Sequence, residues 1–313
     1  MKAIRIHQIG GPEALSLDEI ELGKPSEDQT RIRVELAGVN FIDVYHRRGQ
    51  YQVPLPCTLG IEGIGRSETG DSFFWLSAMG SYAQELNINK DALTKIPPTK
   101  LTHQELLPLL LQGMTAHFLV DSAYQVKSGE SALVTAAAGG VGSLLVQLLV
   151  LRGVKVIACA STEERAERAR LLGAEHAGTY EKMGEIVADA TKGVGVNVVY
   201  DSVGKDYFDT CLGLLAPSGM YILYGAASGP VPPLELMRLN NKSLGIRRPT
   251  LATYTSSASE RQRRLNELIS LAEKGLIQYQ PTKVFPLEQA KQAHELIESR
   301  RWSGKIGLHP WNL

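Results

Sequence analysis

A glycine-rich turn between an apolar strand and an apolar helix constrains the fold of this chain more than any other feature. The turn reads TAAAGGVG over residues 135–142. Strand, glycine turn and helix in that order open a dinucleotide-binding βαβ unit, whose fingerprint is G-x-G-x-x-G. Aligned with it, Ala137 takes the tight-turn position, Gly139 leaves the backbone bare beside a pyrophosphate, and Gly142 permits close packing of helix on strand. The turn predicts a dinucleotide site, with a plain strand-to-helix turn as the alternative.

The start of the helix adds an anion-binding feature. The N–H groups of its first turn, near Gly140 and Val141, have no partner within the helix, and the positive end of the helix dipole lies behind them. We therefore expect the phosphates of the cofactor to bind at this helix N-terminus.

The end of the second strand indicates which dinucleotide binds. NAD sites usually place Asp or Glu there, about 20 residues past the glycines, to bind the ribose 2′-hydroxyl. This chain has Ala160 and Ser161 instead, followed by Arg165 at the start of the next helix. Because no carboxylate at the strand end repels a 2′-phosphate, Ser161 and Arg165 favour NADP(H) over NAD. The alternative places Arg165 on the solvated face of the helix ERAERAR.

Apolar strand runs alternate with helical stretches between Met114 and Gly245, which is typical of βαβ units and a buried parallel sheet. Right-handed connections wind this order into a doubly wound Rossmann fold, so the fold class is α/β. The expected strands are Ser131–Thr135, Val154–Cys159, Val196–Tyr200, Met220–Tyr224 and Ser243–Arg247. The expected helices are Gly140–Arg152, Thr162–Leu172, Glu181–Thr191 and Lys205–Leu215.

The flanking stretches have a different pattern. Before residue 114, Gly and Pro break the chain into short β-rich segments, and a length of 313 residues favours about two domains. The expected elements there are strands Ala3–His7, Gln29–Leu36 and Ser81–Leu86, and a helix Thr102–Leu111; after Pro249 they are helix Glu260–Lys274, strand Thr282–Phe285 and helix Leu287–Arg300. The predicted domain limits are 1–113, 114–248 and 249–313.

Composition excludes several classes of protein. The 33 Lys and Arg balance the 33 Asp and Glu, so no overall field draws the chain to nucleic acid or to anionic lipid. The longest nearly unbroken apolar run, Val141–Leu151, is shorter than the roughly 20 residues of a membrane span. Cys57, Cys159 and Cys211 lie far apart, which argues against a disulfide framework and a cysteine-rich zinc site. With no signal-peptide pattern at the start, the sequence predicts a cytoplasmic protein without a membrane partner.

Five segments spread over nearly the whole chain resemble the quinone oxidoreductase, or zeta-crystallin-like, family of the medium-chain dehydrogenase/reductase superfamily. They are GGPEAL (10–15), GVNFIDVYHRRGQY (38–51), AAAGGVG (136–142), VVYDSVG (198–204) and HELIESR (294–300). The resemblance implies a β-rich, GroES-like catalytic domain that is completed by the C-terminal stretch and interrupted by a Rossmann domain. It also implies NADPH as the cofactor, with its 2′-phosphate held at the positions of Arg165, Tyr180 and Arg300.

The resemblance bears on metal binding as well. Zinc-dependent members of the superfamily have a Cys where this chain has Asn40, and a His where it has Ile61, beside Glu62. With these two ligands missing, the three protein ligands that a catalytic zinc needs are not supplied, so a zinc-free enzyme is expected. The histidines are dispersed along the chain, and the pair Glu175 and His176 is expected in a turn, facing water.

Asn40, Asp43, Tyr45 and Tyr51 match family positions that line the substrate cleft. The resemblance implies that Asn40 and Tyr51 orient the nicotinamide or the acceptor by hydrogen bonds, and that Tyr45 forms an aromatic wall. Two alternatives stay open: Tyr45 as an ordinary core aromatic, and Asp43 as a turn or helix-capping group. One departure from the family is a shortened segment after GIEGIG, where Arg66–Thr69 replaces a longer hairpin; the alternatives are a harmless loop deletion and an altered substrate cleft.

Together these features predict a zinc-independent enzyme that transfers a hydride from NADPH to a quinone. An NADPH-dependent enone or 2-alkenal reductase is a second possibility, because the same hydride reduces an activated alkene. A non-catalytic NADPH-binding sensor, structural protein or RNA-binding protein is a third, although the net charge of zero disfavours nucleic acid. Relatives commonly dimerise through Rossmann-domain strands, which makes the strand Ser243–Arg247 the expected homodimer edge.

Overall fold

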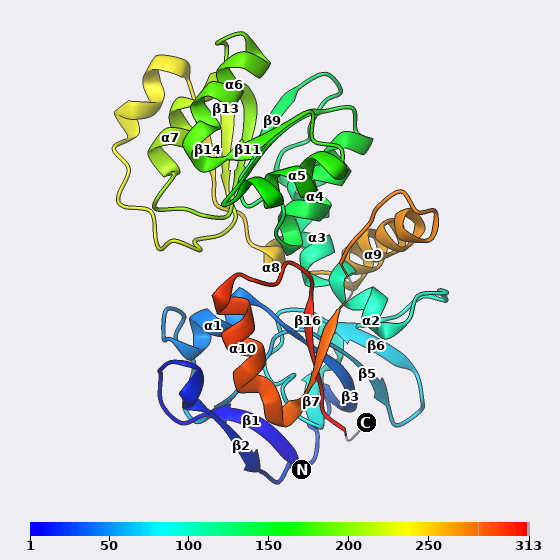
Figure 1. The fold of residues 1–313 in the computed structure, drawn as a ribbon. Helices are drawn as coiled ribbons and strands as arrows, with labels where there is room; N and C mark the ends of the chain where they lie inside the picture. The colour runs from blue at the N-terminus through cyan, green and yellow to red at the C-terminus, as the bar shows by residue number, and fades with distance from the viewer. Residues whose placement is uncertain (281, 312–313) are drawn as a thin grey trace. The chain divides into compact units, whose positions relative to one another are not determined.

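The computed structural model describes residues 1–280 and 282–311. They form two compact units, of which the first comprises Met1–Met114, Thr255–Leu276 and Gln280–Leu313. The second comprises Thr115–Tyr254 with Ile277–Tyr279. Figure 1 shows the second unit as a sheet with helices around it, and the first as a set of mostly antiparallel strands with helices at its sides.

The second unit contains a six-stranded sheet with the order β11-β10-β9-β12-β13-β14, in which every pair is parallel. The strands are β9 (Ser131–Val134), β10 (Lys155–Ala160), β11 (His176–Thr179), β12 (Val196–Asp201), β13 (Leu215–Leu223) and β14 (Gly245–Arg247). The chain runs outward from β9 to β11 and then returns to place β12 on the other side of β9. The order of the strands therefore reverses between β9 and β12, as in a Rossmann fold.

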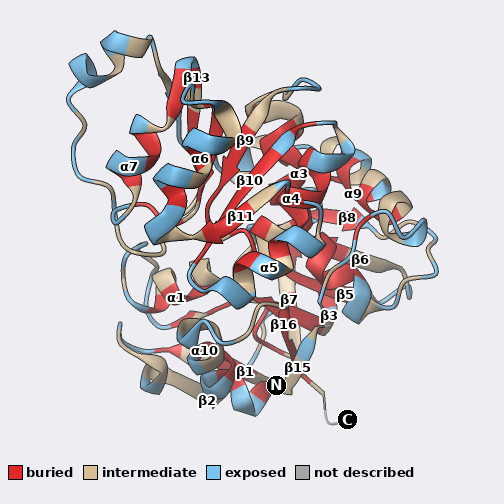
Figure 2. Cartoon of the chain, turned by 45° about the horizontal axis from the view of Figure 1, so that its top comes forward, coloured by how far each residue is buried: buried red, intermediate tan, exposed pale blue. Residues whose placement is uncertain are grey.

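Helices connect these strands, because residues between them repeat apolar side chains at helical spacing. They are α4 (Gly140–Leu151), α5 (Glu163–Leu171), α6 (Met183–Thr191) and α7 (Phe208–Gly213), with the short helical turns η5 (Tyr180–Lys182) and η6 (Leu236–Lys242). Helix α8 (Leu251–Tyr254) follows the last strand, β14. The strands of this sheet are largely buried (Figure 2), which explains why they read as continuous apolar runs in the sequence.

The first unit is built from both ends of the chain. Its largest sheet has the order β15-β16-β3-β5-β6-β8, with β7 also paired to β3, and a smaller sheet has the order β2-β1-β4. The strands are β1 (Lys2–Ile6), β2 (Leu15–Glu19), β3 (Gln29–Val39), β4 (Cys57–Thr58), β5 (Gly63–Ser67), β6 (Ser72–Trp75), β7 (Glu85–Asn89), β8 (Leu93–Lys95), β15 (Lys283–Pro286) and β16 (Ile306–His309). Its main helices are α1 (Phe41–Arg47), α9 (Ala258–Glu273) and α10 (Ala290–Ser299).

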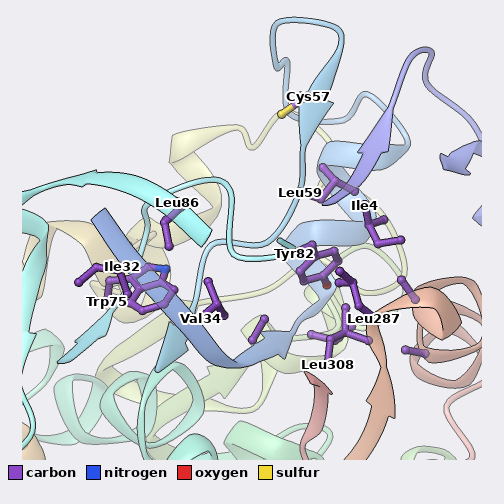
Figure 3. Packing of buried hydrophobic residues seen from close by; sticks show 14 of the residues in the cluster. Ile4, Ile32, Val34, Cys57, Leu59, Trp75, Tyr82, Leu86, Leu287 and Leu308 are labelled. Carbon is purple, nitrogen blue, oxygen red and sulfur yellow. The ribbon is translucent and has the colours of Figure 1, made fainter. Parts of the chain in front are cut away.

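The C-terminal strand β16 pairs antiparallel with β3, so the last residues of the chain complete a sheet begun near its start. The core beneath combines residues from both ends, including Val34, Trp75, Leu287 and Leu308 (Figure 3). Tyr82 is buried within the same cluster. Because this core draws on segments more than 200 residues apart in sequence, the N-terminal and C-terminal stretches depend on each other for stability.

Several predicted elements need correction. The strand placed at Ser81–Leu86 is wrong: β7 begins at Glu85, and Ala83 forms only an isolated bridge with Ala3. The amide of Ser81 instead donates to the Gly60 carbonyl, which turns the chain before β7. The helix Lys205–Leu215 is shortened to α7, because Gly204 and Lys205 are held in a loop by backbone hydrogen bonds and Leu215 already belongs to β13.

Two further corrections concern β11 and the helix before residue 112. His176, expected in a turn, begins strand β11, which pairs with β10. The segment HAGT has small side chains and a weak strand signal, so pairing decides its conformation. The helix expected at Thr102–Leu111 is broken at Pro108, which has no N–H to donate, into α2 (His103–Leu106) and η3 (Leu107–Leu109), before α3 (Leu111–Phe118) and η4 (Leu119–Ala123).

The helical run 103–123 is long and apolar enough, by length and composition alone, to span a bilayer. Of its most apolar window, 72% is buried inside the protein, as in the core helix of a globular protein.

The shortened segment after Gly65 forms a tight hairpin between β5 and β6, whose register pairs Arg66 with Ser72. Gly70 has a φ of +87° in this turn, and its N–H donates to the Ser67 carbonyl, so the sheet closes without the longer hairpin.

Candidate active site

The glycine-rich turn forms as predicted, between β9 and α4. Gly139 is the N-cap residue of α4, and its N–H donates to the carbonyl of Ala136 at 2.8 Å. A Cβ at Gly142 would collide with that same carbonyl oxygen, so only glycine permits the close approach of helix and turn. Ala137 is fully buried at the tight-turn position. The bare backbone at the start of a 12-residue helix fits the phosphates of a dinucleotide.

Strand β10 ends without a carboxylate, as the sequence indicated. The strand ends at Ala160, the exposed Ser161 follows it, and Thr162 caps α5 by accepting from the N–H of Arg165 at 3.3 Å. Arg165 thus lies in the first turn of α5, half-buried.

Tyr180 is joined directly to the glycine-rich turn. Its hydroxyl accepts from the N–H of Ala136 at 2.9 Å, which leaves its own proton to donate to a ligand. Its ring stacks on Tyr207, with ring centroids 4.3 Å apart. Arg300, the third expected phosphate ligand, is exposed at the end of α10 in the other compact unit. Its convergence with Arg165 and Tyr180 stays a prediction.

Asn40 lies at the end of β3, where its side chain joins a buried ion pair. Its Oδ1 accepts from Lys305 Nζ at 2.7 Å, and its Nδ2 donates to Glu62 Oε2 at 2.8 Å. Lys305 and Glu62 pair with each other, and both side chains are fully buried. The other carboxylate oxygen of Glu62 accepts from the N–H of Leu111 at 2.7 Å. Both ends of the Asn40 amide are therefore fixed in orientation, and a Cβ at Gly38 would collide with Glu62.

Sequence reasoning missed Lys305. A lysine directly before an apolar strand, in KIGLH, is the signal that was available, because a full-length lysine side chain at the start of a buried strand needs a partner. Its partners lie more than 240 residues away in sequence, so the spacing of residues gave no sign of them.

Asp43 caps helix α1 and does not lie on an open surface. Its Oδ2 accepts from the Asn40 N–H at 2.8 Å and from the Tyr82 hydroxyl at 3.0 Å, which completes a capping box with Asn40. Complete burial raises the pKa of Asp43 to about 7, although both hydrogen bonds and the charge of Lys305 lower it. The helix-capping alternative thus matches the geometry of Asp43.

The Asp43 contacts continue to helix α10. The Tyr82 hydroxyl lies 3.2 Å from His294 Nε2, and His294 Nδ1 lies 2.9 Å from an Arg47 nitrogen. Burial, together with the Arg47 charge, lowers the pKa of His294 to about 3, so the ring is neutral. Because Arg47 only donates, Nδ1 accepts and Nε2 carries the proton. Arg47 also binds both carboxylate oxygens of Glu298 at 2.9 Å, which ties α1 to α10.

Tyr45 and Tyr51 form an aromatic surface beside this network. Their rings meet edge to face, with centroids 5.8 Å apart and an interplanar angle of 82°. Tyr45 is half-buried, while 44% of Tyr51 is exposed. The N–H of Gln50 donates to the Tyr45 carbonyl, which fixes the loop that carries Tyr51. This pair gives the first unit an aromatic surface that includes the partly exposed Tyr51.

Among the described residues, no group of three His, Cys, Asp or Glu side chains is arranged to hold a metal ion. Asn40 and Ile61 lie at the two positions where the resemblance places zinc ligands. The ammonium of Lys305 contacts both Asn40 and Glu62. A fixed positive charge at this point repels a divalent cation. His176 and Glu175 lie 3.8 Å apart with both side chains exposed, so they face water as expected, although His176 is in a strand.

Comparisons with known proteins agree with this architecture. Residues 140–274 match the family described as zinc-binding dehydrogenase, and residues 26–73 match the alcohol dehydrogenase GroES-like domain. A Rossmann sheet inserted into a GroES-like domain defines a medium-chain dehydrogenase/reductase, which confirms the predicted α/β fold class. The first of these family names mentions zinc, whereas the resemblance places two of the zinc ligands where this chain has Asn40 and Ile61.

Full-length relatives narrow the family. The chain is 35% identical to quinone oxidoreductase of Pseudomonas aeruginosa, over 99% of both chains, and 36% identical to 2-haloacrylate reductase of a Burkholderia species, over 97% of this chain and 98% of the relative. It superposes on Escherichia coli quinone oxidoreductase complexed with NADPH with a TM-score of 0.93, at 34% identity, covering 99% of this chain and 100% of the other. The protein belongs to the quinone oxidoreductase family, as its sequence motifs predicted, and is an oxidoreductase.

Proposed function

We propose that this protein is a zinc-independent oxidoreductase that uses NADPH to reduce a quinone. The observation that carries the proposal is the buried Lys305, which contacts Asn40 and Glu62, while the resemblance places a zinc ligand at the position of Asn40. Full-length similarity to quinone oxidoreductases, among them one solved with NADPH, supports the substrate and the cofactor.

The cofactor supplies the reaction with a hydride from C4 of its nicotinamide ring. The chain contributes binding and orientation. The turn from Ala137 to Gly142, with the N–H groups of Gly140 and Val141, would hold the pyrophosphate. Four side chains would hold the 2′-phosphate: Ser161, Arg165, Tyr180 and Arg300. The missing carboxylate at the end of β10 favours NADPH over NADH.

Asn40, Asp43, Tyr45 and Tyr51 are assigned different tasks. Tyr51 presents its exposed hydroxyl to the acceptor as a hydrogen-bond donor, and Tyr45 supplies an aromatic wall. Asn40 orients the reacting groups from a position fixed by Lys305 and Glu62, while Asp43 holds Asn40 through its backbone N–H. A quinone becomes a hydroquinone by gaining one hydride and one proton, and its low-lying acceptor orbital makes a Lewis acid unnecessary.

The decisive experiment measures NADPH oxidation with a panel of acceptors. We expect 1,4-benzoquinone and naphthoquinones to be reduced, and simple primary alcohols such as ethanol not to be oxidised. Alcohol oxidation in this superfamily uses a zinc ion to stabilise the alkoxide. Robust ethanol oxidation, or the absence of turnover with every quinone despite NADPH binding, would contradict the proposal; the second result would favour a non-catalytic NADPH-binding protein.

The role of Tyr51 can be tested separately. Tyr51→Phe removes only a hydroxyl from a side chain that is 44% exposed, so the fold should be unaffected. We expect a lower kcat/KM for quinone with an unchanged NADPH affinity, because the hydroxyl is assigned to the acceptor. If kcat/KM stays at the wild-type value, Tyr51 has no role in binding the acceptor.

A second candidate function is the reduction of activated alkenes. The similarity to a 2-haloacrylate reductase favours it, because a haloacrylate is an alkene activated by a carboxylate. The same hydride would then reach an alkene carbon, with a proton from water completing the reduction. Comparing kcat/KM for 2-chloroacrylate and 2-alkenals with that for benzoquinone decides between the two substrate classes.

We also propose that the protein forms a homodimer. Strand β14 is the edge of the six-stranded sheet, and Ile246 on it is 36% exposed. An edge strand with an exposed apolar side chain suits pairing with a second copy of the chain. Light scattering of the purified protein would show a homodimer, and a charged substitution at Ile246 should then give a monomer.

A further inference from the structure

Side-chain hydrogen bonds of Thr135 and Asp201 join the loops that follow β9 and β12. These are the two strands between which the order of the sheet reverses. In parallel α/β sheets, ligands bind outside the carboxyl ends of the strands at this reversal. Thr135 directly follows β9 and begins the glycine-rich turn, while Asp201 ends β12 and is followed by the loop Ser202–Gly204. Strand pairing between β9 and β12 ends at Val134 and Tyr200, with one last backbone hydrogen bond from the Thr135 N–H to the Tyr200 carbonyl at 3.1 Å. Beyond that bond, the Thr135 and Asp201 side chains connect the two loops.

Asp201 is a fully buried carboxylate that makes no ion pair within the described part of the chain. Four neutral donors surround it: Thr135 Oγ1 at 2.7 Å, the N–H of Val203 at 2.8 Å, the N–H of Gly204 at 3.0 Å and the Tyr221 hydroxyl at 2.5 Å. A buried carboxylate is tolerated only when its oxygens are well bonded. Because the buried Asp201 carboxylate needs the N–H groups of Val203 and Gly204, it holds the backbone of the loop after β12 in place.

Thr135 closes the connection from the other side. Its hydroxyl donates to Asp201 and accepts from the N–H of Ser202 at 3.1 Å. A single hydroxyl thus joins the start of the glycine-rich turn to both the end of β12 and the first residue of the following loop. Threonine suits this position because the hydroxyl has one proton to donate and lone pairs that accept.

Backbone hydrogen bonds connect the loop after β12 to the loop after β13. The carbonyl of Ser202 accepts from the Ala227 N–H at 3.1 Å, and the carbonyl of Val203 accepts from the Ser228 N–H at 2.9 Å. Gly204, with a φ of +84°, adopts a backbone conformation that a side chain disfavours. Three segments at the carboxyl edge of the sheet are thereby held in one arrangement.

We propose that Thr135 and Asp201 are positioning residues that preorganise the loops of the dinucleotide site before the cofactor binds. The proposal rests on dinucleotide binding by this unit, but not on the identity of the acceptor. Loops that are already ordered lose less conformational entropy when a ligand binds. Removing the hydrogen bonds that Thr135 and Asp201 make between the loops, here called the Thr135–Asp201 lock, should therefore weaken binding without removing any contact to the cofactor. The lock orders loops that would bind the portion of the dinucleotide common to NADPH and NADH, so the affinities for both should fall by the same factor.

The test compares two hydroxyls that join the same two strands at opposite ends. Thr135→Val removes the hydroxyl at the carboxyl ends and keeps the shape of the side chain. Ser131→Ala is the matched control: Ser131 Oγ donates to Asn197 Oδ1 at 3.2 Å, joining β9 to β12 at their amino ends. Thr135→Ser keeps a hydroxyl and serves as the rescue variant. The dissociation constants of NADPH and NADH are measured without any acceptor, together with Tm.

For Thr135→Val we expect both dissociation constants to rise about tenfold, corresponding to about 1.4 kcal/mol, the scale of one hydrogen bond to a charged group. Thr135→Ser should stay within about twofold of the wild type. Ser131→Ala should bind both cofactors normally even if its Tm falls. Asp201→Asn puts an NH2 group against a donor, so the amides of Val203 and Gly204 should exchange hydrogen faster in the cofactor-free variant.

Three results would overturn the proposal. Normal binding by Thr135→Val would show that the lock does not prepare the site. Equal losses in Thr135→Val and Ser131→Ala would show that the effect is one of general stability. A loss for NADPH alone would assign the effect to the 2′-phosphate. If the wild type binds cofactor but reduces no quinone, the proposed substrate fails while this comparison keeps its meaning.

Discussion

Lys305 and Glu62 depend on each other for their charges to be tolerated in the interior. Both side chains are completely buried, and they are joined to Asn40 by two hydrogen bonds. Taking two ions out of water costs several kcal/mol each, which a close pair with further hydrogen bonds offsets. The pair therefore holds Asn40 in place but leaves the fold sensitive to the loss of either partner.

The first prediction concerns this pair. Lys305→Met leaves the Glu62 carboxylate buried without its cation, and we expect the free energy of unfolding to fall by about 3–5 kcal/mol. The double variant Lys305→Met with Glu62→Gln should recover much of this loss, because Gln keeps an acceptor for the N–H of Leu111 and carries no charge. Urea denaturation of both variants measures the difference. If the double variant is no more stable than Lys305→Met, the buried charge is not the cause.

Selection of NADPH is a second property of individual residues. We predict that Arg165→Ala weakens NADPH binding by about tenfold to a hundredfold and leaves NADH nearly unchanged, since a hydrogen bond to a charged group contributes about 1.5–3 kcal/mol. Arg168→Ala, on the same helix, is the matched control and should change neither affinity. Adding Ser161→Asp to Arg165→Ala should turn the preference toward NADH by repelling the phosphate. Titration at one fixed ionic strength tests this; equal losses for both cofactors would make Arg165 an ordinary solvated residue.

At the scale of elements, helices α1 and α10 are joined by polar groups rather than by apolar packing alone. Asp43 and Arg47 come from α1, His294 and Glu298 from α10, and Tyr82 lies between Asp43 and His294. Burial disfavours the charged form of both Asp43 and His294, which raises one pKa and lowers the other. The two shifts have opposite effects on stability as the pH changes.

The third prediction follows from these shifts. Asp43 has a pKa of about 7 in the fold against an ordinary 3.8, so its contribution to stability is lost as the pH rises from about 4 to 7. His294 has a pKa of about 3 against an ordinary 6.5, so its contribution is lost as the pH falls from about 6.5 to 3. Between pH 4 and 6.5 the two slopes oppose each other and largely cancel in the wild type.

Removing either group should expose the slope of the other. In Asp43→Asn, stability relative to the wild type should rise with pH across this window, and in His294→Gln it should fall. Urea midpoints measured at half-unit steps of pH from 4 to 7.5 give the two differences. Slopes of the same sign in both variants would contradict the assignment of opposite shifts to these residues.

At the scale of the whole molecule, the chain interrupts one unit with another. Strand β16 completes the sheet begun by β3, so the catalytic unit forms only after the C-terminal residues are available. Around Asn40 and Ile61 the described residues supply a lysine rather than a set of metal ligands. The expectation of a zinc-free site therefore depends on the assembled unit, because Lys305 comes from the C-terminal stretch and Asn40 and Glu62 from the N-terminal one.

The fourth prediction is that the purified protein contains no stoichiometric zinc and keeps its quinone reductase activity in a strong chelator. The positive charge of Lys305 and the missing ligands both disfavour a divalent ion at this site. Elemental analysis measures the zinc content, and assays before and after dialysis against chelator measure the activity. One zinc per chain, with activity lost on its removal, would contradict the prediction.

The sequence by itself determined the features that depend on neighbouring residues. The turn with Gly139 and Gly142 follows from steric limits within a few residues, and the alternation of strands and helices follows from the periodicity of apolar side chains. The end of the second strand pointed to Ser161 and Arg165, whereas Asn40, Asp43, Tyr45 and Tyr51 were indicated by the family resemblance of segment 38–51.

Only the tertiary structure decided which distant groups meet. Lys305 reaches Asn40 and Glu62, and His294 reaches Tyr82, across more than 200 residues of sequence. Strands β11 and β16 have weak local signals and form because β10 and β3 offer hydrogen-bonding partners. Burial makes these contacts necessary, because a charge or backbone group removed from water must form a hydrogen bond or ion pair. Which partner is near enough in space depends on the packing of the whole chain and not on the local sequence.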